Sequence, residues 1–189
     1  QAAEHIRATN FAYLPLAVLH PRLQQIIELK SIIGVRSPVN TFARMINPFS
    51  APYEIHTVFH PNYREVHLET TKLLGHARMA VFKGEGGEAE RRPQKPVLVQ
   101  SIRDGEIFDE EWPPMLTEST AKKDEVLDLS RLKAVWSGEA EDVYATAAVT
   151  GTIAIALRLM GRAGSIEDVQ AAALEMWNAR DRDNLGIAA

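Results

Sequence analysis

The stretch "ARMAVFKGEGGEAERRP", Ala77 to Pro93, decides how this chain folds. Its first six residues, Ala77 to Phe82, are mostly apolar and predict an interior β-strand. Lys83 then opens a loop of glycines and charged residues, and glycine lets the backbone approach a bound group closely. Ligands in open α/β sheets bind outside the carboxyl ends of the strands. The position of this loop therefore favours a ligand-binding loop over a solvated turn. The ligand could be a metal ion, a phosphate or a nucleic-acid backbone.

The segments around this stretch alternate between strand and helix patterns. Residues that favour β-structure predict a strand from Glu54 to Phe59, and a helix is predicted between Pro61 and Gly75. A further strand runs to about Ile102 and reaches a turn at Asp104 and Gly105 that suits a hairpin. The alternation of strands and helices predicts the α/β fold class. Only about four strands are expected, few for a doubly wound sheet, which suggests a truncated domain.

The N-terminal segment predicts one short strand and two helices. The strand is expected from Phe11 to Leu14. The first helix runs from Pro21 to Gly34, because proline suits a first helical turn, where its missing N–H would have no partner, and glycine suits the end of a helix. A second, shorter helix is expected from Val39 to Ile46.

The C-terminal third is expected to be helical. The segment from Glu139 to Leu159 is rich in alanine and almost entirely apolar in its second half, which predicts a buried helix. Ser165 is expected to cap the N-terminus of the next helix, because Asp168 follows it by three residues in a pattern close to a capping box.

Length and composition exclude several classes of protein. A chain of 189 residues with 46% hydrophobic content is expected to form one globular domain, residues 1–189. The absence of cysteine excludes a disulfide framework and a thiolate zinc site. No apolar run approaches the roughly 18 residues of a membrane span, so we expect no membrane partner and a cytoplasmic location. The chain begins with Gln1, and we expect that an upstream segment has been removed.

Charge is distributed unevenly along the chain. The net charge of -4 argues against a generally basic nucleic-acid binder. Basic residues nevertheless gather between Lys83 and Arg103, whereas acidic residues dominate between Asp104 and Glu125. A locally basic element on an acidic protein is therefore expected.

Two groups of residues suggest a metal ion. Glu88 and Glu90, together with Glu85, supply the carboxylates that Mg²⁺ prefers, although the same charges suit a solvated turn. His56 and His60 are four residues apart, which on a strand would place them on one face. No third ligand accompanies the histidines, so we expect these two to be structural.

The order of the motifs resembles that of glycosyltransferase family 3, typified by anthranilate phosphoribosyltransferase. The matching segments are an aromatic "FAYL", His20-Pro21 before a helix, "GVRSPVN" from Gly34 to Asn40, Asn47-Pro48, "KLLG", "RMAVF" and the loop "KGEGGEA". The resemblance implies the α/β fold of this family, with residues 1–189 as the C-terminal portion of its α/β domain. It also implies that a glycine-rich pyrophosphate loop and an N-terminal helical dimerisation part lie upstream, and that the full-length protein is a homodimer.

The resemblance implies an enzyme that uses phosphoribosyl pyrophosphate with Mg²⁺, but several positions depart from the family pattern. The Asp-Glu pair that holds Mg²⁺ falls on Glu88 and Ala89, so Mg²⁺ binding through Glu88 and Glu90 is expected to be weakened. The histidine that opens this loop is replaced by Lys83. The arginine that holds the carboxylate of anthranilate falls on Lys30, which lacks the bidentate fork. A Gly-Pro pair becomes Ala43-Arg44.

These departures are similar to those of a divergent branch of the family that binds nucleic acid, DNA or RNA, with basic residues in place of the metal. The residues that the resemblance implies for binding a substrate or polyanion are His20, Lys30, Arg36, Asn40, Arg44, Lys83, Gly84, Arg91 and Arg92. Two other interpretations remain: a phosphoribosyltransferase whose acceptor is not anthranilate, and a fold relic with neither activity.

Overall fold

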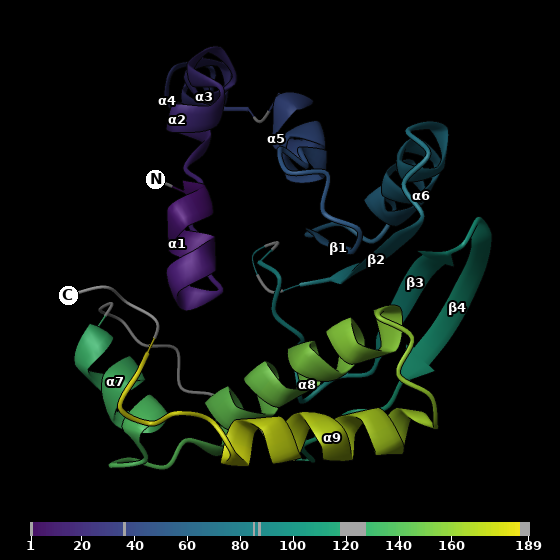
Figure 1. The fold of residues 1–189 in the computed structure, drawn as a ribbon. Helices are drawn as coiled ribbons and strands as arrows, with labels where there is room; N and C mark the ends of the chain where they lie inside the picture. The colour runs from purple at the N-terminus through teal and green to yellow at the C-terminus, as the bar shows by residue number, and fades with distance from the viewer. Residues whose placement is uncertain (1, 36, 85, 87, 118–127, 186–189) are drawn as a thin grey trace. The chain divides into compact units, whose positions relative to one another are not determined.

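The computed structural model describes residues 2–35, 37–84, 86, 88–117 and 128–185 (Figure 1). Contacts divide the chain into two compact units, residues 1–46 with 181–189 and residues 47–180. Whether residues 1–189 form the C-terminal portion of one domain stays a prediction.

The first unit is helical in its described residues. Its elements are α1 (Ala2–Thr9), α2 (Leu16–Leu19), α3 (Pro21–Glu28), α4 (Lys30–Ile33), α5 (Val39–Phe42) and the 3₁₀ helix η1 (Ala43–Met45). Pro21 opens α3 as predicted, because the first turn of a helix needs no N–H there. Gly34 ends α4 with a left-handed φ of 75°, also as predicted.

Two predictions for the first unit are wrong in detail. Residues Phe11 to Leu14 carry no strand, because a strand needs a paired neighbour and this segment has none among the described residues of its unit. The helix predicted from Pro21 to Gly34 is interrupted at Leu29, where α3 ends and α4 begins. The second predicted helix starts at Val39 and tightens into the 3₁₀ helix before Ile46.

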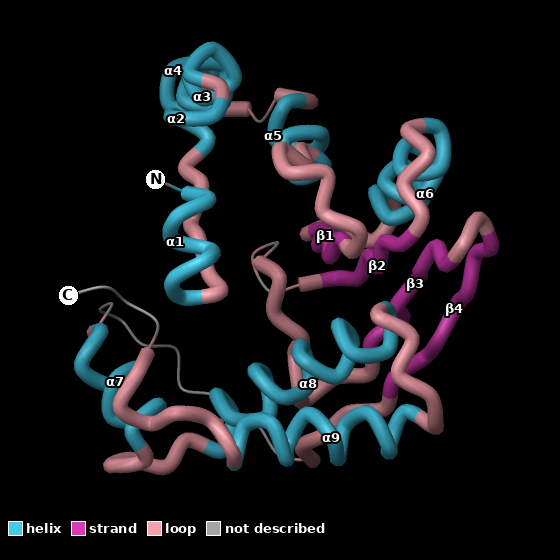
Figure 2. The backbone as a smooth tube through the Cα atoms, in the orientation of Figure 1, coloured by secondary structure: helices cyan, strands magenta, loops and turns pink. Residues whose placement is uncertain are grey.

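The second unit contains a four-stranded sheet. Its strands are β1 (Glu54–Val58), β2 (Arg78–Lys83), β3 (Val97–Arg103) and β4 (Glu106–Trp112), in the order β1-β2-β3-β4 (Figure 2). Strands β1 and β2 are parallel, whereas β2–β3 and β3–β4 are antiparallel. The helix α6 (Tyr63–Leu73) connects β1 to β2, because parallel neighbours need a crossover. This mixed architecture confirms the predicted α/β class.

Helices cover both faces of the sheet. On one face, Ala80 and Phe82 of β2 pack against α8 (Val143–Leu159) and α9 (Ile166–Asn178), which run side by side (Figure 1). On the other face, Met79 and Val81 pack with Leu68 of α6. Alternate residues of a strand point to opposite faces, so this pattern confirms that β2 is an interior strand.

The ends of the elements follow local sequence signals. Asp104 and Gly105 take positive φ angles of 54° and 89° and join β3 to β4 in the predicted hairpin. The helix α7 (Leu129–Ser137) precedes α8, and Asp142 caps α8 by accepting a hydrogen bond from the N–H of Ala145. Ser165 and Asp168 form the full capping box of α9. In the described part of the chain, no helix is long and apolar enough to cross a membrane.

Candidate functional site

The loop between β2 and β3 leaves the sheet where two parallel strands end together. Val58 at the end of β1 is in register with Lys83 at the end of β2. The N–H of Gly84 donates to the carbonyl oxygen of Val58 at 3.2 Å, which ties the start of the loop to the end of β1. The loop thus begins at the carboxyl edge of the parallel pair, the position at which ligands bind in α/β sheets.

Gly84 is buried and serves the packing of the loop. A Cβ atom at this position would collide with the carbonyl oxygen of Glu88 and lie 3.3 Å from the Cβ of Thr57. The collision is with backbone, so no side-chain rotation relieves it. Gly84 therefore allows the backbone at Glu88 to pack closely against it, and its predicted contact with a ligand stays a prediction.

Arg91 is completely buried, so the expectation that it faces solvent from an exposed loop is wrong. Its main-chain N–H donates to Thr152 Oγ1 of α8 at 3.0 Å, and its Nη2 donates to the carbonyl oxygen of Pro113 at 2.5 Å. The guanidinium carbon lies 5.1 Å from the centroid of the Trp112 ring, within the range of a cation–π contact. These contacts fasten the loop to the end of β4 and to α8.

Room for Arg91 comes from a glycine in the middle of α8. A Cβ atom on Gly151 would lie 2.8 Å from Arg91 Cδ and 2.8 Å from Met115 Sδ. Burial lowers the pKa of Arg91 to about 10, so the side chain stays cationic at neutral pH. Its Nε and Nη1 atoms have no hydrogen-bond partner within the residues that the structure describes. Gly151 was not singled out in the sequence, although a glycine inside a helix is a signal from which this close packing could have been predicted.

The other charged residues of the loop that the structure describes are accessible. Lys83 and Arg92 are partly exposed, and Lys95 is exposed. Glu88 is exposed, and Glu90 is partly exposed with its N–H donating to the carbonyl oxygen of Glu88 at 2.8 Å. No group of three or more histidine, aspartate or glutamate side chains is placed to hold a metal ion in the described parts of the chain. Magnesium binding by the two glutamates stays a prediction.

The other predicted site residues belong to the first unit. His20 is exposed between α2 and α3, Lys30 is exposed at the start of α4, and Arg44 is exposed in η1. Asn40 is partly buried in α5. Arg36 lies outside the described residues. Since these residues and the loop belong to different units, their grouping into one site stays a prediction.

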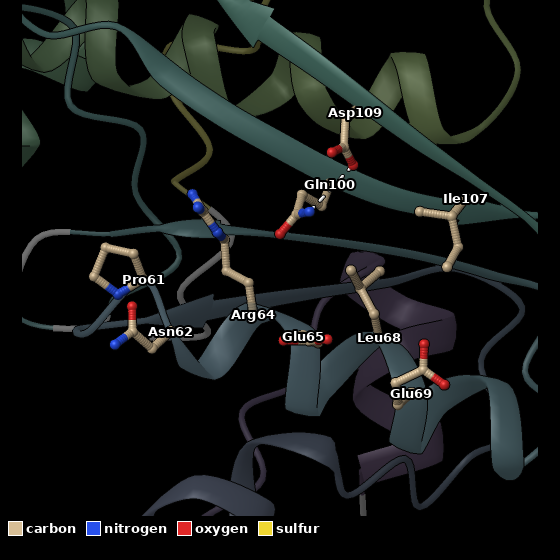
Figure 3. Close-up of a pocket in the computed structure, with 9 residues that line it drawn as sticks. All are labelled: Pro61, Asn62, Arg64, Glu65, Leu68, Glu69, Gln100, Ile107 and Asp109. Carbon is tan, nitrogen blue, oxygen red and sulfur yellow. Dashed lines mark hydrogen bonds between the residues drawn. The ribbon is translucent and has the colours of Figure 1, made fainter.

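A pocket of about 390 Å³ lies between α6 and the strands β3 and β4 (Figure 3). On the side of the pocket formed by the sheet, Gln100 Nε2 donates to Asp109 Oδ1 at 3.1 Å. Arg64 extends into the pocket from α6. Its lining residues are Pro61, Asn62, Arg64, Glu65, Leu68, Glu69, Gln100, Ile107 and Asp109. No motif in the sequence pointed to this pocket, because it joins residues from three elements that meet only in the folded sheet.

His56 does not pair with His60, because β1 ends at Val58 and leaves His60 in the following turn. His56 instead contacts His67 of α6 and Glu54 of its own strand. The expectation that His56 is structural agrees with its burial, 4% exposed. The contact with His67 was not predictable from the spacing of residues along β1, because His67 lies on α6.

Comparisons with known proteins support the resemblance of the motifs. No model of a protein family matches the chain. An anthranilate phosphoribosyltransferase of Burkholderia mallei (strain SAVP1) is 27% identical over 191 residues, which are 98% of this chain and 56% of that protein. An anthranilate phosphoribosyltransferase of Burkholderia multivorans is 27% identical over 173 residues, 89% of this chain and 50% of that protein. The chain thus spans about half the length of the curated relatives it matches.

A solved structure confirms the fold. The crystal structure of anthranilate phosphoribosyltransferase from Thermus thermophilus superposes with a TM-score of 0.69, covering 93% of this chain and 54% of that one, at 22% identity. The chain is therefore anthranilate phosphoribosyltransferase-like in sequence and in fold, as its motifs predicted.

Proposed function

We propose that this anthranilate phosphoribosyltransferase-like protein binds nucleic acid, DNA or RNA, through phosphate contacts made by the loop between β2 and β3. The observation that carries the proposal is the position of Lys83 and Arg92. Both are accessible cations in the segment that leaves the carboxyl edge of β1 and β2, on a protein whose net charge is -4. Accessible cations at a ligand-binding edge suit a phosphate backbone.

The burial of Arg91 changes the set of contacting residues. Arg91 lies under the loop and holds it to Trp112 and Thr152, so it positions the loop and touches no ligand. Lys95 joins the set because it is exposed in the same segment. The proposed phosphate contacts are thus made by Lys83, Arg92 and Lys95.

The chemistry of the loop favours binding without sequence preference. Residues 83–96 contain no aromatic side chain, so bases have no ring to stack on in this segment. Glu88 and Glu90 lie in the same loop and oppose a polyanion. Binding is therefore expected to be weak and to depend steeply on salt, because releasing counterions from phosphates supplies its free energy.

An anisotropy titration with labelled single-stranded and duplex oligonucleotides of several sequences tests the proposal. We expect binding at low salt, with similar affinity for every sequence of one strand type, that falls as salt rises. No binding at any salt concentration would overturn it. A preference for one sequence would overturn the assignment to phosphate contacts alone.

A second candidate is transfer of a phosphoribosyl group to an acceptor other than anthranilate. The names of the relatives favour it, since they are anthranilate phosphoribosyltransferases. In this case Glu88 and Glu90 would hold Mg²⁺ beside the pyrophosphate of phosphoribosyl pyrophosphate. Calorimetry with phosphoribosyl pyrophosphate separates the two: tight binding that requires Mg²⁺ and is lost in Glu88→Ala and Glu90→Ala supports the enzyme.

A further inference from the structure

We infer that a pH-sensitive latch holds α6 on β1, formed by the side chains of His67, His56, Glu54 and His76. Acid opens this latch, because the two buried histidine rings can share one proton between their facing Nδ1 atoms but cannot carry a proton on both of these atoms. The latch lies within the second unit and does not depend on the proposed binding of nucleic acid.

The four side chains form one continuous line of contacts. His67 Nδ1 of α6 lies 3.2 Å from His56 Nδ1 of β1, with the two rings edge to face at 71°. His56 Nε2 lies 3.4 Å from Glu54 Oε2, and the other oxygen of Glu54, Oε1, pairs with His76 Nδ1 in the turn before β2. The line joins a helix, a strand and a turn.

The contact between the two rings fixes where protons sit. Two nitrogen atoms at 3.2 Å form a hydrogen bond only when one carries a proton and the other accepts it. If His56 donates from Nε2 to Glu54, its neutral ring must accept at Nδ1, and His67 must then donate from its own Nδ1. The two neutral rings are thus expected in opposite tautomers. Protonating both Nδ1 atoms would turn the hydrogen bond into a repulsive contact.

Burial makes the second proton costly. His56 is 4% exposed and His67 is fully buried, so water has almost no access to either ring. Desolvation lowers the pKa of His56; Glu54 opposes this shift and His76 adds to it. From β2, the residue opposite His56 is Val81, which carries no charge. The charged or titratable groups that contact His56 or shift its pKa are Glu54, His67 and His76. Lys83, two residues beyond Val81 on β2, lies on the same face of the sheet.

The sign of the pH dependence follows from these contacts. An unfolded histidine has a pKa of 6.5 and binds a proton freely below it, whereas the folded pKa of His56 is lower. Between these two values the unfolded chain binds more protons than the folded chain, so the latch stabilises the fold above pH 6.5 and loses this stabilisation as the pH falls. Each proton that the folded state excludes raises the unfolding constant by about tenfold per pH unit.

The first test is a nitrogen-15 NMR titration of the histidine rings in the native protein. At pH 7.5 we expect one ring of the pair to carry its proton on Nδ1 and the other on Nε2, and at most one of them to become charged before α6 loosens. Two rings that share the same tautomer and titrate independently near pH 6.5 would overturn the latch. This test needs no variant, so it stands even if substitutions prevent folding.

The second test compares urea unfolding between pH 5.0 and 7.5 in the wild type, His67→Gln and the control His60→Gln, which alters an exposed ring in the turn after β1. We expect the wild type and the control to lose stability in parallel on acidification and His67→Gln to lose less. Hydrogen exchange, corrected for intrinsic rates, should show α6 losing protection at pH 5 before α8. Equal acid sensitivity of wild type and His67→Gln, or simultaneous loss of protection in both helices, would contradict the proposal.

Discussion

Arg91 and Arg92 are adjacent in the chain, and the structure gives them opposite environments. Arg91 is fully buried against Trp112 and Gly151, whereas Arg92 stays partly exposed. The pair looks equivalent in the sequence, because both follow an acidic glycine-rich loop. The partners that separate them, Trp112 and Thr152, are distant in the chain, so local pattern gave no way to choose which arginine turns inward.

Alanine substitutions separate the two arginines by stability. Arg91→Ala removes a buried side chain together with its contacts to Pro113 and Trp112, so we expect a loss of about 2–4 kcal/mol in the free energy of unfolding. Arg92→Ala removes a partly exposed side chain and should change it by no more than about 0.5 kcal/mol. Urea unfolding of both variants measures the difference. Similar values for the two would show that Arg91 is not the anchor of the loop.

At the scale of single elements, most of the fold was predictable. Strands β1 and β2, helix α6, the β3–β4 hairpin and the helix α8 follow from apolar pattern and from proline and glycine at their ends. The prediction of a strand from Phe11 to Leu14 was wrong. The residue types indicate only a preference for extended backbone, whereas a strand also needs a neighbouring strand to pair with. The pocket beside α6 and the contact between His56 and His67 depend on tertiary packing, so no local pattern contains them.

The capping box of α9 gives a prediction at this scale. Ser165 accepts a hydrogen bond from the N–H of Asp168, and the carboxylate of Asp168 accepts one from the N–H of Ser165 at 2.7 Å. Ser165→Ala leaves the N–H of Asp168 without this acceptor and should cost about 1 kcal/mol. Glu175→Ala on the exposed side of the same helix is the control, with an expected change below about 0.5 kcal/mol. Thermal unfolding of the two variants checks the difference; equal melting temperatures would contradict it.

At the scale of the whole molecule, the chain covers about half of its curated relatives and folds as two compact units. The loop and Lys83 lie in one unit, and His20, Lys30, Asn40 and Arg44 lie in the other. The sequence predicted the fold class and the position of the loop at a strand end. It could not decide whether the two groups of residues act together, because this depends on how the units meet.

The substitutions relative to the family pattern lead to a prediction about activity. Lys30, Ala43-Arg44 and Ala89 alter the expected positions for anthranilate and for Mg²⁺. We therefore expect no detectable anthranilate phosphoribosyltransferase activity when the protein is assayed with phosphoribosyl pyrophosphate, anthranilate and Mg²⁺. Robust turnover would show that these positions tolerate the changes and would favour the enzyme over the nucleic-acid binder.

The salt dependence of oligonucleotide binding in matched variants tests the central claim most directly. The double variant Lys83→Ala/Arg92→Ala removes two proposed phosphate contacts. The control, Arg162→Ala, removes an exposed cation that follows the end of α8. This end of α8 lies at the start of β2, away from the loop, because Arg78 donates to the carbonyl oxygen of Leu159 there. Each contact contributes about -0.9 to the log–log slope on duplex DNA and about -0.7 on single strands.

We expect the double variant to flatten the slope by about 1.4 to 1.8 units, according to the strand type, while Arg162→Ala keeps the slope of the wild type. An unchanged slope in the double variant, or equal flattening in Arg162→Ala, would contradict the assignment of phosphate contacts to the loop between β2 and β3.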